Sequence, residues 1–512
     1  MRSLLAVLWL LGLISSSSAA DSRPNILFLF SDDQNPRTIR CYPQSWDWVQ
    51  TPNIDALAKT GIRFEHCYLG AWCMPSRASL LTGHQPHGIQ SMRMEGKYPG
   101  STYDPRQCPF WPALFRKNGY HTAHIGKWHT GTDAGFGRDW DYQIVWNRPA
   151  RPENAGNYYV DQIVDWNGVE KKVDGYSTDN DTKWACDYIR GEGRSKDKPW
   201  FLWLCYGAIH GPSTPAPRHK GSYKDAPVEL PVDILPPRPQ KPEYLNRSQA
   251  WIKGDDGGVY AGKSAEAFGD EAGNRKKSYA DFVRQMNECA RALDEGIGQV
   301  MATLKESGQL DNTLVVFAAD QGFGMGEHGF RAKLAPYESN YNSPLIVSMP
   351  SRFPQGKVCR SPVGGPDLVQ TFLKTAGVDV PWKTHGRDLT EILRNPTREE
   401  APRALFYEDM GQAYGSECNV IPTDDKIYHG NVPRWIAIRY GKYKYIRTLI
   451  AGEMEELYDL EKDPQELTNL ALKSEHQSLV KDLRARTINE LRRTEAGFVD
   501  ALPETRQMKS GG

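Results

Sequence analysis

The sequence predicts an α/β protein: a large, mostly parallel sheet flanked by helices, followed by a smaller C-terminal subdomain of antiparallel strands and a helix. Three observations support this fold class. Nearly continuous apolar runs recur between residues 25 and 348, helical segments separate them, and short strand-like runs follow one another after residue 403. A strand buried on both faces reads as an unbroken apolar run, so its alternation with helices indicates a parallel sheet.

The first strand and the first helix are marked by their end signals. Residues 25–30 read NILFLF and form the first predicted strand. Thr51 then offers an N-cap, Pro52 occupies the first helical position, and Gly61 supplies the stop. A strand followed by a short helix is the opening expected of an α/β domain.

Later segments repeat the pattern. Three further apolar runs, WFLWLCY, LVVFAA and LIVS, lie at residues 200–206, 314–319 and 345–348. A long helix is predicted from Tyr279 to Gly308, because apolar residues recur there every three or four positions. A second helix is predicted at residues 367–377, DLVQTFLKTAG. The apolar face of the long helix is therefore expected to pack in the core.

Composition divides the mature chain into two parts, a catalytic domain at residues 21–395 and a C-terminal subdomain at residues 396–512. Residues 212–275, rich in Pro and then in Gly, are typical of a long surface insertion. Such a loop often shapes a substrate pocket, and a mobile loop without a role fits the composition equally well. Pro and charged residues at 395–403 mark the boundary, after which come the strand-like runs ALFYE, RWIAIRYG, YKYIRT and ELYDL and a helix around residues 476–492.

Charge balance excludes some partners. The 512 residues contain 63 Lys and Arg against 63 Asp and Glu, so the formal net charge is zero and no polyanion-binding surface is indicated. After the first segment no stretch approaches the ~20 apolar residues of a membrane span. We therefore expect neither a nucleic acid partner nor an integral membrane protein.

The first twenty residues predict export. Arg2 precedes an apolar run, and the run ends in small residues, with Ser18 and Ala20 placed as in a signal-peptidase site. Residues 1–20 are therefore interpreted as a signal peptide, which leaves the periplasm, the lysosome and the exterior open. The nine cysteines are an odd number for an oxidising compartment, so at least one lacks an intrachain partner; a disulfide is the default expectation for any of the eight besides Cys73.

The most informative stretch is CMPSRASLLTG, residues 73–83. Pro75 suits the first turn of a helix, so Cys73 is expected just ahead of a helix N-terminus, where unpaired backbone N–H groups favour negative charge. Arg77 adds a fixed cation one turn along. From these residues alone, the site is a reactive cysteine or an anion site, with a disulfide cysteine as the alternative.

This stretch resembles the signature of the formylglycine-dependent sulfatases, a family of the alkaline-phosphatase-like superfamily. The pattern of Cys, any residue, Pro, Ser, Arg, three residues, Leu, Thr and Gly is met in full. Similar segments occur in family order along nearly the whole mature chain, among them NILFLFSDDQ, GYHTAHIGKWH, VVFAADQGFGMGEHG and ELYDLEKDPQELTNLA. The resemblance implies that Cys73 is oxidised to formylglycine by a formylglycine-generating system during export, which would account for the odd cysteine.

Two polar pairs are expected on one rim of the sheet. Asp32 and Asp33 follow the first strand, and Asp320 and Gln321 follow LVVFAA. Singly, such residues are more often caps or turns, but together they indicate a metal ion. Their oxygens suit Ca²⁺, which takes about 6 to 8 of them, with Mg²⁺ as runner-up and position 73 completing the site. Sulfatases usually carry Asn or His where Gln321 stands.

Cations and histidines complete the predicted site. Three carboxylates with one divalent ion leave about one negative charge, so an anionic substrate requires protein cations, supplied by Arg77, Lys127 and Lys333. Lys127 and His129 lie two residues apart in GKWH and would face the same way in an extended segment. His210 follows a strand, and two further residues, Gly211 and Pro212, open the next loop. His328, in GEHG, is a weaker candidate for the substrate rim.

The resemblance also implies a mechanism. A formylglycine hydrate at position 73 attacks the sulfur, Asp320 assists its deprotonation, and the metal polarises a sulfate oxygen. His210 protonates the departing alcohol, and Lys333 binds sulfate oxygens. His129 then helps to deprotonate the second hydroxyl, which expels sulfate and restores the aldehyde.

Two other functions compete with a sulfatase. The same metal and cations would serve a phosphodiesterase or a phosphonate monoester hydrolase. A secreted protein that only binds sulfated glycans, with Cys73 as a thiol or in a disulfide, is the second. Among sulfate esters a sulfated carbohydrate is preferred over a small aryl sulfate, because a long insertion can build extended subsites.

Overall fold

The computed structural model describes residues 23–90, 92–95, 100–103, 110–154, 157–262, 277–398 and 402–506. The predicted signal peptide at residues 1–20 lies outside the described residues, as do Cys108 and residues 263–275 of the predicted insertion. No helix in the described ranges combines the length and the apolar character needed to cross a bilayer.

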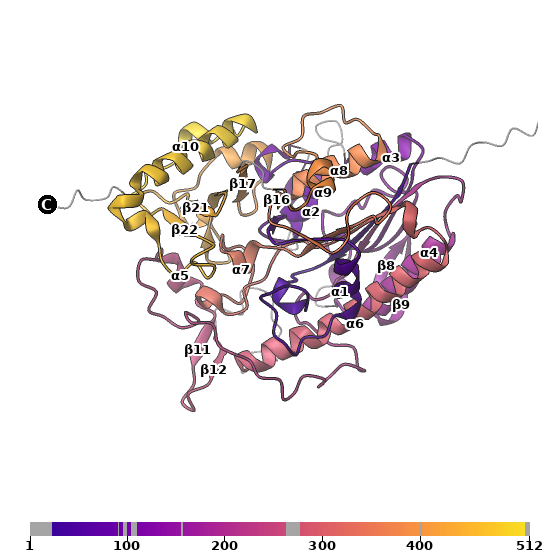
Figure 1. Cartoon of the computed structure of the whole chain (residues 1–512), viewed down its shortest axis with the longest axis horizontal. Helices are drawn as coiled ribbons and strands as arrows, with labels where there is room; N and C mark the ends of the chain where they lie inside the picture. The colour runs from indigo at the N-terminus through magenta and orange to yellow at the C-terminus, as the bar shows by residue number, and fades with distance from the viewer. Residues whose placement is uncertain are drawn as a thin grey trace, which may run out of the picture.

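Ten strands of the described chain form the central sheet (Figure 1). In spatial order they are β15 (Lys357–Cys359), β2 (Ile62–Phe64), β14 (Leu345–Ser348), β13 (Thr313–Ala319), β1 (Asn25–Ser31), β10 (Trp200–Cys205), β6 (His121–Lys127), β7 (Tyr142–Trp146), β8 (Val160–Trp166) and β9 (Val169–Tyr176). The middle strands, from β13 to β7, are parallel to one another. The predicted fold class is therefore confirmed.

The sheet becomes antiparallel toward both sides. β14 runs antiparallel to β13 and β2, and β8 is antiparallel to both β7 and β9. The apolar run of β14 suggested another parallel strand, but such a run reports burial on both faces and carries no information on direction.

Helices cover both faces of this sheet (Figure 1). One face packs on α1 (Pro52–Lys59), α4 (Ser177–Arg190) and α6 (Tyr279–Glu306), and the other on α2 (Cys73–Thr82), α3 (Pro112–Lys117), α8 (Gly365–Ala376) and α9 (Thr390–Arg394). Successive residues of β1 alternate between the two layers: Leu27 and Leu29 face the first, Phe28 and Phe30 the second. Burial on both faces explains the unbroken apolar sequence of β1.

The C-terminal part forms a separate antiparallel sheet beside the main one (Figure 1). Its strands are β17 (Ala404–Asp409), β20 (Trp435–Tyr440), β21 (Tyr443–Thr448) and β22 (Glu456–Asp459). Helix α10 (Gln477–Arg493) packs Val480 and Leu483 against Ile438, Tyr445 and Leu457 of this sheet. The described part of the chain thus contains the predicted small antiparallel sheet and its helix.

Short elements connect these layers. They are β3 (Cys67–Tyr68) with β16 (Val363–Gly364), β4 (Met92–Glu95) with β5 (Gly100–Tyr103), β11 (Trp251–Lys253) with β12 (Val259–Ala261), β18 (Tyr428–His429) with β19 (Val432–Pro433), and the helices α5 (Tyr244–Arg247) and α7 (Glu338–Tyr341). Residues 212–243, in the predicted insertion, contain none of the named helices or strands. Lys241 anchors this stretch, because its Nζ donates to Tyr458 Oη at 2.7 Å.

The default expectation of disulfides is wrong for five of the described cysteines besides Cys73. Their thiols are free, and they are Cys41, Cys67, Cys186, Cys205 and Cys289. Four of these side chains, all except that of Cys41, are buried, and the five come from different strands, helices and loops. Packing in a core of this size makes cross-links unnecessary for stability.

Candidate functional site

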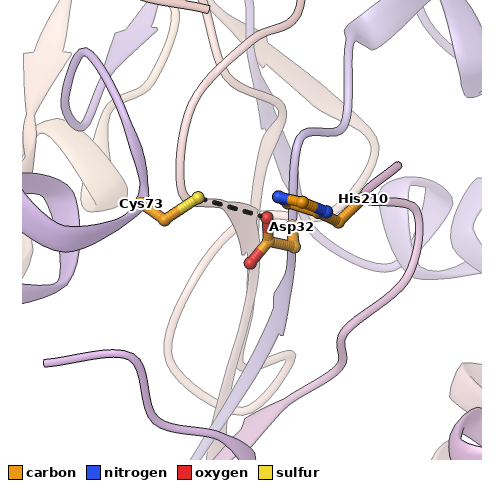
Figure 2. Close-up of side chains that lie close together, drawn as sticks. All are labelled: Asp32, Cys73 and His210. Atoms are coloured by element: carbon orange, nitrogen blue, oxygen red, sulfur yellow. Dashed lines mark hydrogen bonds between the residues drawn. The ribbon is translucent and has the colours of Figure 1, made fainter. Parts of the chain in front are cut away.

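Cys73 begins helix α2, and Trp72 occupies the N-cap in an extended conformation. The thiol is buried, with Lys333 Nζ at 3.0 Å and Asp32 Oδ1 at 3.4 Å from its sulfur. Figure 2 shows Asp32 between Cys73 and His210. Burial and the carboxylate of Asp32 raise the pKa of the Cys73 thiol to about 12. An unmodified Cys73 is therefore a poor nucleophile at neutral pH, because the thiolate is the reactive form.

Acidic side chains from two strands meet at this helix. Asp32 and Asp33 follow β1, Asp320 follows β13, and these strands are parallel neighbours, so their carboxyl ends share one rim. One ligand atom from each of the three aspartates and Cys73 lies within 4.8 Å of all the others. The rim arrangement expected from the sequence is therefore present.

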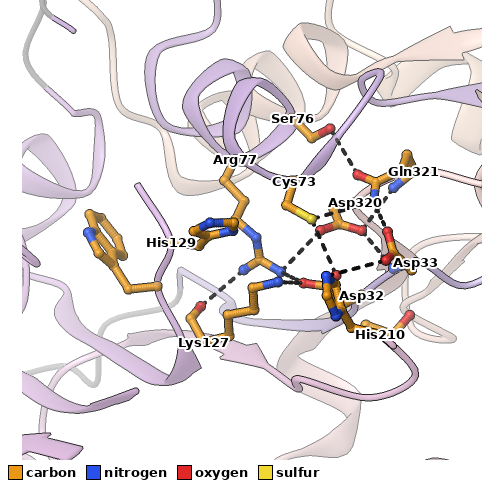
Figure 3. Close-up of polar contacts among 12 residues, drawn as sticks. Asp32, Asp33, Cys73, Ser76, Arg77, Lys127, His129, His210, Asp320 and Gln321 are labelled. Carbon is orange, nitrogen blue, oxygen red and sulfur yellow. Dashed lines mark hydrogen bonds and ion pairs between the residues drawn. The ribbon is translucent and has the colours of Figure 1, made fainter. Parts of the chain in front are cut away.

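Gln321 also lies in this group. Its Nε2 donates to Asp33 Oδ1 and lies 3.7 Å from the sulfur of Cys73, while Ser76 Oγ donates to its Oε1 at 3.4 Å (Figure 3). The amide thus presents nitrogen to the carboxylates. A cation between them would require the amide to rotate and present its oxygen.

Three cations surround the acids, and Figure 3 shows two of them, Arg77 and Lys127. Arg77 donates to Asp32 Oδ2 at 2.8 Å and to Asp320 Oδ2 at 3.3 Å, and Lys127 Nζ donates to Asp32 Oδ2. Lys333 Nζ lies 2.8 and 2.9 Å from the carboxylate oxygens of Asp33. The side chains of Arg77 and Lys127 are each 1% exposed, so water screens these interactions very little.

The electrostatics of the three acids differ. Burial favours the neutral form of Asp32, but Lys127, His210, Arg77 and Lys333 outweigh it and hold its pKa well below the ordinary value. Burial raises the pKa of Asp33 and of Asp320, and the charge of Asp32 adds to both shifts. The protein's own cations do not fully offset the burial and mutual repulsion that oppose ionisation of all three acids. Their hard oxygen donors therefore fit a divalent ion, which would favour ionisation of all three.

His210 follows β10 and faces the same centre. Its Nδ1 lies 2.7 Å from Gly211 O, which leaves Nε2 toward Asp33 Oδ2 at 3.6 Å. Burial and the charges of Lys333 and Lys127 hold the pKa of His210 well below its ordinary value. In its neutral form, with the proton on Nδ1, Nε2 is an acceptor.

His129 is placed differently from the sequence expectation. Strand β6 ends at Lys127, and His129 has a φ of +60°, so the segment is not extended through both residues. The chain turns where the paired strand β7 also ends, at Trp146, and Trp128 packs in the core. Arg148 donates from Nη2 to His129 Nε2 at 3.2 Å. Burial, followed by the charges of Lys127 and Arg148, lowers the pKa of His129 well below the ordinary value.

Tyr158 is a residue that the sequence analysis missed. Its ring stacks on the imidazole of His210, with centroids 4.1 Å apart and planes at 3°, and Lys127 Nζ lies 4.9 Å from the same ring centroid. Tyr158 precedes β8 in a connecting segment and carries no motif. Only the fold brings it to the site.

His328 lies away from the Cys73 centre. Its Nδ1 is 2.6 Å from Asp233 Oδ2, its backbone N–H donates to Asp233 Oδ1 at 2.9 Å, and its side chain is 2% exposed. The hydrogen bonds join the segment that carries Lys333 to the predicted insertion. Burial, followed by Lys241, lowers the pKa of His328 to about 4.

The pKa of His328 predicts an acid-sensitive stability. In the unfolded chain His328 becomes protonated below the ordinary His pKa of about 6.5, whereas in the folded protein it stays neutral down to about pH 4. Stability should therefore fall with pH in this window, by up to about 3 kcal/mol from this group. In urea unfolding at pH 7 and pH 4.5, His328→Gln should show a smaller pH-dependent loss than the wild type. The partly exposed His476→Gln should leave the loss unchanged; an unchanged loss in His328→Gln would contradict the assignment.

A buried cysteine at a helix N-terminus, carboxylates and cations gather on the rim of a large α/β sheet, and this set of groups fits a divalent ion and an anionic ester. The family model "Sulfatase" matches residues 24–378, and "N-sulphoglucosamine sulphohydrolase, C-terminal" matches residues 326–494. The chain therefore belongs to the sulfatase family, of the alkaline-phosphatase-like superfamily, and is a sulfuric ester hydrolase.

Several relatives match over nearly the whole chain. An N-acetylglucosamine-6-O-sulfatase of Bacteroides thetaiotaomicron is 29% identical, covering 98% of this chain and 92% of the relative. An arylsulfatase of Clostridium perfringens is 26% identical, covering 93% and 96%. A solved structure in complex with its substrate D-glucosamine-2-N,6-O-disulfate has a TM-score of 0.76 and 25% identity, covering 93% and 99%. A phosphonate monoester hydrolase of Silicibacter pomeroyi shares the fold, with a TM-score of 0.68, 21% identity and coverage of 93% and 97%.

Proposed function

We propose that the protein is an exported sulfatase that hydrolyses sulfate monoesters on a carbohydrate, with the nucleophile produced from Cys73 by formylglycine conversion. The observation that carries the proposal is the position of Cys73, at the N-terminus of α2 and within 3.4 Å of both Lys333 Nζ and an Asp32 oxygen. The matured side chain offers a hydrated aldehyde, which is a better oxygen nucleophile than the protonated thiol.

The metal ligands in this proposal are Asp32, Asp33, Asp320, Gln321 and the side chain at position 73. Family membership implies a divalent ion, and Ca²⁺ is proposed over Mg²⁺ because the donors are carboxylate and amide oxygens in an irregular group. When bound, the ion supplies Lewis acidity to a sulfate oxygen. The side-chain cations of Arg77, Lys127 and Lys333 then offset the negative charge that the ion leaves unbalanced.

Lys333 and Lys127 are assigned to the sulfate oxygens. Lys333 contacts the sulfur atom of Cys73, and Lys127 donates to Asp32 Oδ2, the oxygen next to the one that faces Cys73. Arg77 fixes the orientation of Asp32 and Asp320 through its two hydrogen bonds. Asp320 assists deprotonation of the nucleophile. These fixed charges stabilise the additional negative charge of the transition state.

Proton transfer is assigned to the histidines. Cleavage of the S–O bond with water yields an alcohol and sulfate, and the departing oxygen needs a proton. His210 Nε2 faces the centre, and the incoming negative charge of the sulfate ester would favour its protonation. His129 is assigned to deprotonation in the step that releases sulfate, since its imidazole is buried and neutral. Its acceptor nitrogen is Nε2, because Arg148 donates to it, and that hydrogen bond must break before Nε2 takes a proton.

A sulfated amino sugar is the proposed substrate. The relatives at greatest coverage include an N-acetylglucosamine-6-O-sulfatase, and a structural neighbour is bound to D-glucosamine-2-N,6-O-disulfate. Release of inorganic sulfate from N-acetylglucosamine 6-O-sulfate by the matured protein tests this proposal. No release from this compound, from glucosamine 2-N,6-O-disulfate or from an aryl sulfate would refute it.

Phosphoryl or phosphonyl transfer is the second candidate, favoured by the shared fold of the phosphonate monoester hydrolase. Rates on an aryl sulfate and on an aryl phosphate diester, measured side by side, separate the two. A kcat/KM higher on the diester would replace the sulfatase proposal.

The chain is proposed to have three parts. Residues 1–20 form a signal peptide that is removed on export. Residues 21–395 form the catalytic domain, and residues 396–512 form the C-terminal subdomain. Charge balance supports the absence of nucleic acid from its partners. The periplasm, the exterior and the lysosome are the compartments consistent with a signal peptide.

Replacement of His210 by alanine should depend on the leaving group. On a sugar sulfate, kcat/KM should fall by roughly 10²- to 10⁴-fold, because a sugar alkoxide needs the proton. On 4-nitrophenyl sulfate the loss should be about tenfold or less, because nitrophenolate leaves without protonation. The control His476→Ala should lower neither rate, and equal losses on both substrates would exclude His210 as the proton donor.

A further inference from the structure

Two consecutive tyrosines ahead of β8 contact His210. The ring of Tyr158 lies flat on the imidazole, with centroids 4.1 Å apart and planes at 3°. The hydroxyl of Tyr159 donates to the backbone oxygen of His210, and the backbone N–H of Ser213 donates to the same oxygen at 2.9 Å. The side chain and the backbone of His210 are therefore held by separate contacts.

The segment that carries these tyrosines is itself fixed. The backbone oxygen of Tyr158 accepts from Ser177 Oγ at 2.8 Å and from Gln162 Nε2 at 3.1 Å. The backbone N–H of Ser177, the first residue of α4, donates to the backbone oxygen of Tyr159 at 2.8 Å. Tyr158 is 2% exposed and Tyr159 is 3% exposed. Close packing and these hydrogen bonds leave both rings little freedom to move away from His210.

The orientation of the imidazole depends on two contacts. The hydrogen bond from Nδ1 to Gly211 O, at 2.7 Å, fixes one edge of the ring, and the flat contact with Tyr158 fixes its plane. Together they leave Nε2 toward Asp33 Oδ2 and the centre. A proton donor must lie within hydrogen-bond reach of the leaving oxygen and point at it, so an imidazole that is free to tilt is a poorer donor.

Tyr158 acts at a distance from the substrate. A cavity of about 600 Å³, its mouth included, opens beside the centre, and His210 and Lys333 belong to its lining. Tyr158 is absent from the described lining and is buried behind His210. Lys127 Nζ also lies 4.9 Å from the centroid of the Tyr158 ring. One ring therefore supports two side chains of the candidate site.

We propose that Tyr158 is a positioning residue, which holds the imidazole of His210 in the orientation for proton transfer to the leaving oxygen, and that Tyr159 fixes the backbone of His210 for the same purpose. This inference rests on the proposed function and adds two residues to it. The face of the Tyr158 ring carries the effect, because its buried hydroxyl has no hydrogen-bond partner among the described residues. Phenylalanine should therefore replace Tyr158.

The first test compares leaving groups. Tyr158→Leu should lower kcat on N-acetylglucosamine 6-O-sulfate about 10- to 100-fold, with KM changed less than about threefold. On 4-nitrophenyl sulfate the loss should be about threefold or less, because nitrophenolate leaves without protonation. A contribution through Lys127 would lower both rates alike and leave their ratio unchanged. Tyr158→Phe should stay within about threefold of the wild type on both substrates.

Tyr159→Phe removes one hydroxyl without a change of shape, so it provides a second variant that is expected to fold. It should show the same dependence on the leaving group with a smaller loss. The matched control is Tyr407→Leu on β17, because the ring of Tyr407 is 1% exposed and lies flat on that of Tyr68, at 4.7 Å and 3°. This control should unfold at a lower temperature and keep the wild-type ratio of the two rates.

A double mutant tests whether Tyr158 acts through His210. In a His210→Ala background, Tyr158→Leu should lower the rate on the sugar sulfate by less than about twofold beyond any loss on 4-nitrophenyl sulfate. Equal losses on both substrates in Tyr158→Leu, or an undiminished extra loss in the His210→Ala background, would overturn the inference. Loss of the leaving-group effect in Tyr158→Phe as well would show that the ring face is not its origin.

The orientation of His210 can also be measured without turnover. In protein with ¹³C-labelled histidine, the imidazole C–H resonances of His210, assigned by their absence from His210→Ala, should be shifted upfield by the ring current of Tyr158. The shift should persist in Tyr158→Phe and disappear in Tyr158→Leu, and resonances unchanged in Tyr158→Leu would contradict the contact. If the resonances behave as expected but no sulfate ester is hydrolysed, the orientation of His210 by Tyr158 stands and the proposed sulfatase function fails.

Discussion

Cys73→Ala is expected to lower kcat/KM for sulfate ester hydrolysis by roughly 10⁴-fold or more, because removal of a nucleophile leaves only binding and electrostatic stabilisation. The side chain at position 73 stands at the N-terminus of α2 beside Lys333 and Asp32, and no other residue is assigned to attack. Initial rates on N-acetylglucosamine 6-O-sulfate and on an aryl sulfate measure the loss. The protein must come from a host with a formylglycine-generating system.

A second cysteine and a mass measurement control this experiment. Cys41→Ala removes a half-buried free thiol from another loop and should keep wild-type activity. Mass spectrometry of the peptide that contains Cys73 should find an aldehyde in the active protein. A wild-type peptide with only thiol or disulfide, together with binding but no turnover of sulfated sugar, would favour a glycan-binding protein over an enzyme.

Removal of the divalent ion is expected to abolish turnover and to lower stability. The proposed ligand atoms lie within 4.8 Å of one another and belong to Asp32, Asp33, Asp320 and Cys73. A bound cation therefore reduces the electrostatic repulsion between the carboxylates in the folded protein. At a free Ca²⁺ concentration about 100 times Kd, the ion should add about 2.7 kcal/mol, or about 3 °C in the thermal midpoint of a chain this long. Thermal unfolding with chelator, Ca²⁺ or Mg²⁺ measures the shift, and we expect Ca²⁺ to give the larger one.

Asp320→Asn removes one ligand charge while keeping the shape of the side chain. It should lose the Ca²⁺-dependent shift and lower kcat by roughly 10³-fold. The matched control is Asp294→Asn, another buried carboxylate, which bonds the backbone of Asn53 and Ile54 at the start of α1. This variant should unfold at a lower temperature but keep the full Ca²⁺ shift. An intact shift in Asp320→Asn would remove Asp320 from the metal site.

The pKa directions give the pH dependence of this binding. Burial and the charge of Asp32 raise the pKa of Asp33 and of Asp320, so a metal ion must displace protons from them. Affinity for Ca²⁺ should therefore weaken as the pH falls. A calorimetric Kd that is the same at pH 8 and pH 5.5 would contradict this assignment.

Local sequence predicted four of the ten strands described in the central sheet, β1, β10, β13 and β14, and the acids that meet at its rim. The apolar run of β1 and the periodicity of α6 each indicated an element that the structure contains, and the sulfatase resemblance is confirmed by the family match. The acids after β1 and β13 were expected together because parallel neighbours end on one rim. The chemical roles of these residues stay a prediction that the variants above test.

Other features depended on contacts between distant segments. The left-handed backbone at His129, the stacking of Tyr158 on His210 and the bond from Asp233 to His328 have no local signature. Each depends on two elements whose distance in space cannot be read from their distance along the chain. The free thiols of Cys67, Cys186, Cys205 and Cys289 follow in the same way from their burial on separate elements.

The amino-acid sequence by itself determined the alternation of strands and helices, the presence of a helix at the Cys73 motif and the family, because periodicity, capping and a contiguous motif are properties of neighbouring residues. Only the tertiary structure decided the direction of β14 and the neighbours of each histidine in the site. Those features arise from packing and charge between segments far apart in the chain, and such interactions exist only after the chain has folded.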